Sequence, residues 1–160
     1  MELLGVRLEL PANAPVVLLR EQTGERVLPI YIGPEEARAI ALALEGVATP
    51  RPMTHDLLRD ALTALGATVV SVTVTDFCDR TFFAELELLQ AGRTVRVSSR
   101  PSDAIALAVR VDAPIFAAEG VLDEAAAPTA QESDDPEEQE EIVDQFREFI
   151  DQVKPEDFAG

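Results

Sequence analysis

Several residue types are scarce in this chain of 160 amino acids, which has one cysteine, one histidine and no tryptophan. The single thiol, Cys78, cannot form a disulfide within the chain or supply a cluster of thiolate metal ligands. No apolar run approaches the ~20 residues that a membrane-spanning helix needs. The first residues alternate as in a strand, not as in a signal peptide. We therefore expect a soluble protein of the cytoplasm, with no membrane segment.

Basic charge is also scarce, because 13 Lys and Arg residues face 30 Asp and Glu residues, for a net charge of −17. Residues 121–160 hold 14 of the acidic side chains and only two of the basic ones. The first 120 residues, with 11 Arg and 16 acidic residues, are mildly acidic. Proteins that bind nucleic acid usually present basic patches. A role of that kind would therefore need a local cluster of arginines or bound cations.

What is present is a pattern of short strands and helices. Alternating apolar residues predict strands over residues 2–10, 16–20, 27–32, 67–77, 82–88 and 94–98. Helix signals predict helices that begin near residues 35, 54 and 100, and a short strand end and helix within 115–126. Thr54 is a suitable N-cap for the second helix. Its apolar stripe is expected to be buried, and it consists of Leu57, Leu58, Ala61, Leu62 and Leu65.

The order of these elements, three strands and then two helices, occurs twice. The sequence AIALAL at residues 39–44 returns as AIALAV at residues 104–109, each time after a strand and an acidic helix start. The six-residue match alone can arise by chance in an alanine-rich chain. Together with the matching order of elements it favours an α+β fold built from a duplicated β3-α2 unit.

The chain divides into a domain over residues 1–122, an acidic, proline-broken linker over 123–139 and an amphipathic helix with a tail over 140–160. In the last segment acidic residues fill one helical face, and the other face holds Ile142, Phe146, Phe149, Ile150 and Val153. This helix binds a partner protein in one interpretation. In the other it docks on its own domain or on a second subunit.

The stretch RPSDAIALAVR, residues 100–110, predicts a helix that is apolar on nearly every side and therefore buried. Pro101 suits the first helical position, and a negative charge at Asp103 suits the positive end of the helix dipole. Arg100, Asp103 and Arg110 lie on one stripe of this helix. Buried charges must be paired, so these side chains face either a substrate or one another.

His55, the one histidine, precedes Asp56 in the first turn of the second predicted helix. A helix N-terminus favours the neutral imidazole, which is the form that acts as a base. With neighbouring carboxylates, His55 could bind a divalent cation or act as a general base on a phosphodiester. The alternative is that His55 caps the helix or hydrogen-bonds locally.

Three carboxylates, Glu36, Asp56 and Asp103, each fall in the first turn of a predicted helix. If these helix starts converge at one rim of a duplicated sheet fold, the carboxylates could hold Mg²⁺ or Mn²⁺, which prefer oxygen ligands. The alternative is that each acid complements its own helix dipole.

Three arginines, Arg51, Arg100 and Arg110, could neutralise the phosphates of a nucleic acid. The alternative is that they form salt bridges to the same carboxylates, and Arg100 could do so with Asp103 on its own helix.

Three segments in order, LPIYIGPEEARAIALAL, RPMTHDLL and RPSDAIALAVR, together with the strand FFAELEL, resemble the bifunctional nuclease domain family. The resemblance covers roughly residues 1–125. It implies that the two β3-α2 units form a single barrel-like mixed sheet with the helices packed outside, often in a homodimer. It also implies DNase and RNase activity.

On this resemblance we expect a nuclease that hydrolyses DNA or RNA with a divalent cation and low sequence selectivity. In this hypothesis Glu36, Asp56 and Asp103 hold the cation and His55 activates water. Nucleic acid would be bound by Arg51, Arg100 and Arg110. The alternative is a non-enzymatic interaction or regulatory module, in which these residues form a structural charge network and the acidic C-terminal helix binds another protein.

Overall fold

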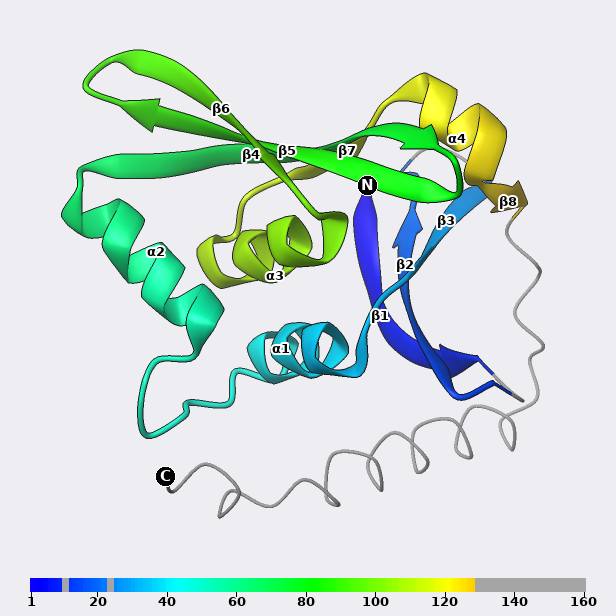
Figure 1. Ribbon diagram of the computed structural model, residues 1–160, viewed down its shortest axis with the longest axis horizontal. Helices are drawn as coiled ribbons and strands as arrows, with labels where there is room; N and C mark the ends of the chain where they lie inside the picture. Colours follow the sequence, from blue (N-terminus) through cyan, green and yellow to red (C-terminus); the bar gives the residue numbers. More distant parts are fainter. Residues whose placement is uncertain (10–11, 23–24, 129–160) are drawn as a thin grey trace.

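The computed structural model describes residues 1–9, 12–22 and 25–128, which form two four-stranded sheets and four helices (Figure 1). The first sheet has the strand order β1-β2-β3-β8 and the second has the order β6-β5-β4-β7. Neighbouring strands are antiparallel except for β4 and β7, which are parallel. The first sheet contains β1 (Glu2–Glu9), β2 (Ala14–Arg20), β3 (Arg26–Tyr31) and β8 (Ala127–Pro128). The second contains β4 (Ala67–Cys78), β5 (Thr81–Gln90), β6 (Arg93–Ser99) and β7 (Ile115–Ala117).

The helices are α1 (Pro34–Leu44), α2 (Thr54–Ala64), α3 (Pro101–Val111) and α4 (Glu119–Ala125). Three strands followed by two helices therefore occur twice along the described chain, with β7 inserted between α3 and α4 and β8 added at the end. This confirms the predicted order of elements and the α+β class. The duplication itself stays a prediction.

Helix α3 forms the centre of the hydrophobic core, as its all-round apolar sequence predicts. Its residues from Ala104 to Ala108 are buried, with Ile105 and Leu107 fully inaccessible. Figure 1 shows α3 beneath the second sheet, with α1 on its other side and α2 beside it. The start of α3 therefore lies close to both of the other helices that carry predicted site residues.

The prediction of a single barrel-like sheet is wrong, since the described strands form two separate open sheets. A closed barrel needs every strand to pair on both sides. Here β7 is three residues long and β8 only two, so each ends a sheet without joining it to the other. At the opposite edge, six of the seven residues of β6 are exposed and the strand has no second neighbour in the described chain.

Helix α2 differs from its prediction in two ways. Its apolar stripe is not buried: none of the residues of α2 is buried, Leu57 is 62 % exposed, and Leu65, just after the helix, is 69 % exposed. Only Leu62 packs, partly buried, against the core. The N-cap is Met53 instead of Thr54, so the helix begins one residue earlier than that cap predicts, and the Asp56 carboxylate accepts the Met53 N–H.

None of the four helices in the described ranges combines the length and the apolar character that crossing a bilayer requires. Helix α4 runs to Ala125 and is followed by β8, which pairs with β3. The predicted C-terminal helix of residues 140–160 and most of the predicted acidic linker lie outside the described residues.

Candidate functional site

The starts of α1, α2 and α3 bring four of the predicted site residues together around one guanidinium. Arg100 donates from Nε to Asp103 Oδ2 at 2.7 Å and from Nη2 to Asp103 Oδ1 at 3.1 Å. Its Nη1 lies 3.0 Å from Glu36 Oε1. His55 Nε2 lies 3.1 Å from Asp103 Oδ1. We call Glu36, His55, Arg100 and Asp103 the Arg100 cluster.

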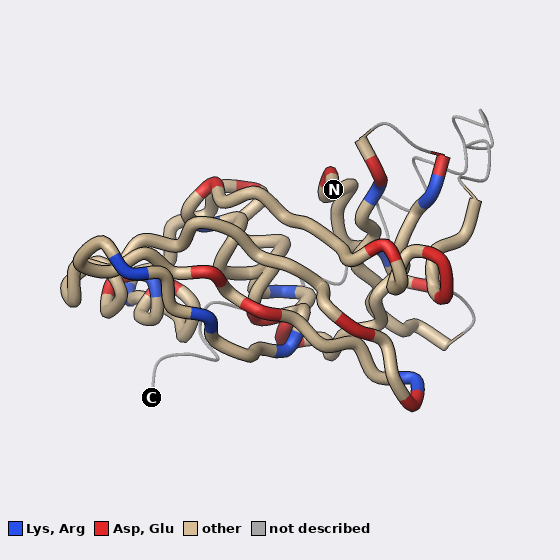
Figure 2. The backbone as a smooth tube through the Cα atoms, turned by 90° about the horizontal axis from the view of Figure 1, so that it is seen from above, with Lys and Arg blue, Asp and Glu red and all other residues tan. Residues whose placement is uncertain are grey.

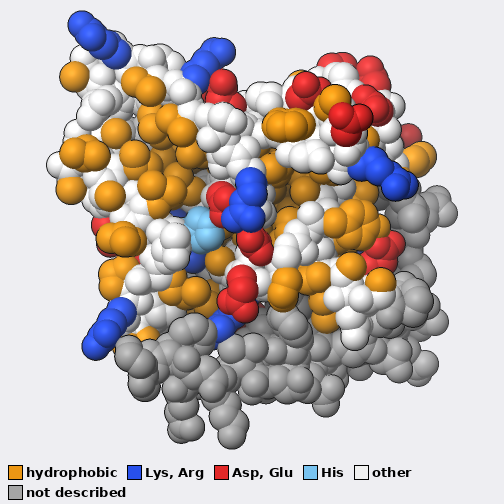
Figure 3. Space-filling view, viewed as in Figure 1, with side chains coloured by type: hydrophobic (Ala, Val, Ile, Leu, Met, Phe, Trp, Pro, Cys, Tyr) orange, Lys and Arg blue, Asp and Glu red, His pale blue; other side chains and the backbone are white. Residues whose placement is uncertain are grey.

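The Arg100 cluster is open to solvent on the side of its arginine. The Arg100 side chain is 65 % exposed, whereas those of Asp103 and His55 are 30 % and 12 % exposed. Figure 3 shows the histidine, coloured pale blue, at the surface beside acidic and basic side chains. The salt bridges expected in the alternative interpretation are therefore present, but the outer edge of the Arg100 guanidinium remains accessible.

The carboxylate of Asp103 fixes the tautomer of His55. Burial by itself raises the pKa of Asp103, but hydrogen bonds from Arg100 and His55 outweigh it and hold that pKa below its ordinary value. An ionised Asp103 only accepts hydrogen bonds, so His55 Nε2 carries the proton and donates it. The other ring nitrogen, Nδ1, is then an acceptor. It has no protein partner among the described residues and is not fully buried, because every fully buried side-chain N or O atom there has a partner.

The position of Glu36 depends on the residue that precedes its helix. Gly33 is the N-cap of α1, and a Cβ atom at Gly33 would collide with Glu36 Oε2. The glycine has an ordinary extended backbone, so the requirement is one of space and not of conformation. The motif GPEE therefore leaves room for the Glu36 carboxylate to turn back toward Arg100.

Asp56 and Arg110 form a second, more deeply buried group, which we call the Asp56–Arg110 pair. Arg110 donates from Nε to Asp56 Oδ1 at 2.7 Å and from Nη1 to the carbonyl of Ala106 at 2.8 Å. The Met53 N–H donates to Asp56 Oδ2 at 3.0 Å. The Arg110 side chain is only 5 % exposed and that of Asp56 20 %. Burial raises the pKa of Asp56, but the hydrogen bonds from Arg110 and Met53 outweigh it and lower the pKa overall.

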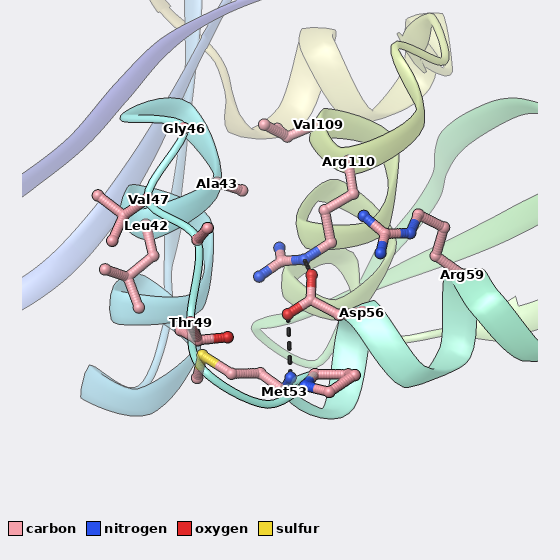
Figure 4. Close-up of a pocket in the computed structure, with 12 residues that line it drawn as sticks. Leu42, Ala43, Gly46, Val47, Thr49, Met53, Asp56, Arg59, Val109 and Arg110 are labelled. Atoms are coloured by element: carbon pink, nitrogen blue, oxygen red, sulfur yellow. Dashed lines mark hydrogen bonds and ion pairs between the residues drawn. The ribbon is translucent and has the colours of Figure 1, made fainter. Parts of the chain in front are cut away.

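A pocket of about 410 Å³ lies next to this pair (Figure 4). The end of α1, the connection from Gly46 to Met53, the start of α2 and the end of α3 surround it. Figure 4 shows the guanidinium of Arg110 and the carboxylate of Asp56 extending between the wall formed by Leu42 and Val47 and the wall formed by α2. Sequence reasoning missed this pocket, since only the fold brings the two ends of the α1–α2 connection against α3.

One predicted site residue, Arg51, lies outside both groups. Arg51 lies in the connection between α1 and α2, with an exposed side chain that has no ion pair among the described residues. Of the three carboxylates predicted to hold a cation, Glu36 and Asp103 share Arg100, whereas Asp56 is engaged by Arg110. Across the part of the chain that the structure describes, no three His, Cys, Asp or Glu side chains are arranged to hold a metal ion. The cation stays a prediction.

Charge outside these two groups is mixed. Figure 2 shows acidic and basic residues close to one another at several places along the described backbone. On the second sheet, for example, Arg96 lies within 3.6 Å of Glu85 and Glu87. The arginines of the body are thus partly neutralised by neighbouring acids, which agrees with the mildly acidic charge of the first 120 residues.

Sequence comparison identifies proteins that are similar to this chain. The profile of the bifunctional nuclease domain matches residues 17–130. "Uncharacterized protein Rv1829" of Mycobacterium tuberculosis is 46 % identical, over 100 % of this chain and 98 % of its own length.

Plant proteins are more distant relatives. "Bifunctional nuclease 2" of Arabidopsis thaliana is 33 % identical over 66 % of this chain and 32 % of its own length. "Bifunctional nuclease 1" of Oryza sativa subsp. japonica is 28 % identical over 68 % of this chain and 34 % of its own length. The chain thus spans about a third of these plant proteins and nearly all of the mycobacterial protein. Since the profile covers most of the chain, including the Arg100 cluster and the Asp56–Arg110 pair, this chain belongs to the bifunctional nuclease domain family.

Proposed function

We propose that this protein is a nuclease that hydrolyses phosphodiester bonds of DNA or RNA with low sequence selectivity. The observation that carries the proposal is the hydrogen bond from His55 to Asp103, with Asp103 itself fixed by Arg100. A carboxylate that orients an imidazole and leaves its second nitrogen free is the arrangement of a general base. Membership of the bifunctional nuclease domain family supports the choice of substrate.

In the proposed reaction, His55 Nδ1 accepts a proton from a water molecule as the water oxygen attacks phosphorus. The bond from phosphorus to the leaving oxygen breaks, that oxygen takes up a proton from the solvent, and the His55 imidazolium afterwards releases its proton to the solvent. Asp103 stabilises the imidazolium that forms, because its carboxylate lies at the other ring nitrogen. The exposed edge of Arg100 is available to the phosphate oxygens, on which negative charge increases in the transition state.

Glu36 has a positioning role in this proposal. It contacts Arg100 on the side opposite to the bidentate Asp103 contact, so the guanidinium is held between the two carboxylates. These two carboxylates also oppose the approach of a phosphate. A divalent cation, as predicted from the sequence, would offset that repulsion.

The proposal is tested with the purified full chain on single-stranded DNA, duplex DNA and RNA, each with EDTA, Mg²⁺ or Mn²⁺. Replacing His55→Ala is expected to lower the cleavage rate by about 10²- to 10⁴-fold. The control is Leu57→Ala, an exposed residue of the same helix that contacts neither polar group. Unchanged cleavage by the His55→Ala, Asp103→Ala double variant would show that the site is elsewhere.

Protein interaction is the second candidate function, favoured by the apolar surface that α2 and β6 leave exposed. Figure 3 shows apolar side chains over the region of α2 and the second sheet. The exposed apolar residues of these elements are Leu57, Leu58, Val95 and Val97, with Leu65 following α2. Exposed apolar patches of this kind mark interaction surfaces, and a homodimer would cover them. Light scattering of the wild type and of the Leu57→Gln, Leu65→Gln double variant would test association, and no cleavage of any nucleic acid by the wild type would favour this function.

A further inference from the structure

The Asp56–Arg110 pair contains a hydrogen-bond donor that the protein does not use. Arg110 donates from Nε and Nη1, but Nη2 has no acceptor among the described residues. Every fully buried side-chain N or O atom of the described residues has a partner. Arg110 Nη2 has none, so this atom is accessible to solvent or to a ligand. The rest of the side chain is almost inaccessible, and Arg110 lines the pocket. Figure 4 shows its guanidinium directed into that space.

Asp56 supplies an acceptor beside this donor. Each of its carboxylate oxygens already takes one hydrogen bond, from Arg110 Nε or from the Met53 N–H. A carboxylate oxygen has two lone pairs, so each oxygen keeps capacity for another donor. The carboxylate borders the pocket, and Figure 4 shows it between Arg110 and Met53. The polar wall therefore offers a donor and an acceptor side by side.

The charge of this wall favours a neutral ligand edge over a free anion. Asp56 cancels the charge of Arg110, and Arg59, which also borders the pocket, is paired with Asp60 at 2.9 Å. Much of the remaining lining is apolar, with Leu42, Val47 and Val109 among its members. A volume of about 410 Å³ is within the range of small-molecule pockets. The ligand that fits has a compact apolar body and an edge that pairs a C=O with an N–H.

We propose that this pocket binds the base of a nucleotide by its lactam edge, as found in guanine, uracil and thymine. The carbonyl oxygen accepts from Arg110 Nη2, and the ring N–H donates to the Asp56 carboxylate. The choice of a nucleobase rests on the proposed nuclease function. Adenine and cytosine present a ring nitrogen and an amino group in place of the lactam, so they match this wall less well.

The proposal gives Asp56 and Arg110 a role distinct from that of the Arg100 cluster. His55 and Asp56 are consecutive residues of α2, yet they contact different residues of α3, Asp103 in its first turn and Arg110 in its last turn. A strand whose phosphate lies at the Arg100 cluster would thus have a neighbouring base near the pocket. The overall low selectivity of cleavage would then include a preference for lactam bases at one position.

The test measures binding of GMP, UMP, AMP and CMP to the full chain by calorimetry, together with NMR shifts of the methyl groups of Ala43, Val47 and Val109. Nuclease-resistant single-stranded oligomers of each base form a parallel series. Ala43→Leu places a larger side chain in the pocket without touching the Arg100 cluster. The matched control, Ala64→Leu, makes the same change at an exposed position of the last turn of α2.

We expect GMP and UMP to bind at least about tenfold more tightly than AMP and CMP. Their binding should also shift the NMR signals of the pocket methyl groups. The Ala43→Leu variant should lose at least about tenfold in affinity for GMP and UMP, whereas Ala64→Leu should keep the wild-type affinity. The same order in the oligomers identifies a base of a strand as the ligand, and its restriction to mononucleotides identifies a free nucleotide. Equal binding of all four bases, no binding, or methyl shifts away from the pocket would overturn the proposal. The wild-type NMR map decides the result even if Ala43→Leu does not fold.

Failure of this proposal and failure of the nuclease proposal give different results. Cleavage that needs His55 but shows no base preference, with Ala43→Leu as active as the wild type, overturns the base pocket and leaves the nuclease. Selective binding of GMP and UMP without cleavage of any nucleic acid supports the pocket and contradicts the nuclease.

Discussion

The Arg100 cluster and the Asp56–Arg110 pair each contain an arginine paired with carboxylate side chains, but the two arginines differ in exposure. Arg100 is 65 % exposed and Arg110 only 5 % exposed. An exposed ion pair contributes little to stability, whereas removing one partner of a buried pair leaves a charge without compensation. The comparison indicates that the first group is free to exchange its protein contacts for a substrate. The second keeps its internal contacts, so a ligand can bind only to the donor and acceptor atoms that these contacts do not use.

The largest expected effect follows from breaking the buried pair. Asp56→Ala leaves the Arg110 guanidinium without its carboxylate and should lower the free energy of unfolding by about 3 kcal/mol. Asp103→Ala should cost less, on the order of 1–2 kcal/mol, because Arg100 can turn to water. Urea unfolding of both variants measures the difference. Equal losses would contradict the distinction between a buried and an open group.

Replacing the whole pair provides the control for this result. Asp56→Leu combined with Arg110→Met removes both charges, and exchanging a buried ion pair for apolar side chains is often neutral. The double variant should therefore be more stable than Asp56→Ala, by about 2 kcal/mol or more. If it is as unstable as the single variant, the loss comes from packing and not from an uncompensated charge.

Acidification tests both groups together and is the next effect in size. The pKa values of Asp56 and Asp103 are below their ordinary values in the folded protein, chiefly through hydrogen bonds from their arginines that outweigh burial. The unfolded chain therefore binds more protons at acid pH, so this stabilisation is complete above about pH 5 and is lost as the pH falls through the folded pKa values.

Unfolding curves recorded from pH 7 down to pH 2 would measure this loss. A double variant, Asp56→Asn with Asp103→Asn, should lose less stability over the same interval, because it lacks the two carboxylates that must be protonated. If the wild type and the double variant lose stability in parallel, other carboxylates control the acid response.

Removing the exposed arginine should have a smaller effect on stability. Arg100→Ala is expected to change the free energy of unfolding by less than about 1 kcal/mol, because its contacts are exposed. The same variant should lower the nuclease rate, since the phosphate loses its cation. A large loss of stability with unchanged cleavage would assign Arg100 to the fold instead of the reaction.

The smallest effect is expected at a residue of α2 that contacts neither group. Leu57→Gln removes an apolar side chain that is 62 % exposed, so the free energy of unfolding should stay within about 0.5 kcal/mol of the wild type. Both Leu57→Gln and the wild type should show the same cleavage and the same nucleotide affinity. A loss above 2 kcal/mol would mean that Leu57 is covered in solution, as in a dimer.

The sequence predicts much of the fold because its local signals agree with one another. The alternation of β4 and β5, the glycine and proline at the start of α1 and the apolar sequence of α3 each lead to the observed element. The prediction that the apolar stripe of α2 is buried was wrong for a physical reason. Periodicity shows which residues share a face, but not whether another element covers that face. Closure into a barrel depends on the pairing of edge strands, which no local pattern records.

For the candidate site, local spacing predicted one contact but not how the residues group. A 3-residue spacing on one helix correctly indicated that Arg100 and Asp103 could pair. That His55 contacts Asp103 while its neighbour Asp56 contacts Arg110 depends on how α2 crosses α3, which the sequence does not specify. The pocket is similarly a product of tertiary packing, and its lining of ordinary apolar residues gives no motif to recognise.

The sparse burial of α2 has a consequence for how the site assembles. Two of the side chains that fasten it to α3 are His55 and Asp56, both in its first turn, while Leu62 makes a partly buried apolar contact. A helix held in this way belongs to the low-stability part of a protein, where local opening precedes global unfolding. Each opening of α2 would separate His55 from Asp103 and Asp56 from Arg110 at once. A ligand that bridges α2 and α3 would therefore slow amide hydrogen exchange along the whole of α2, in proportion to its concentration relative to its Kd.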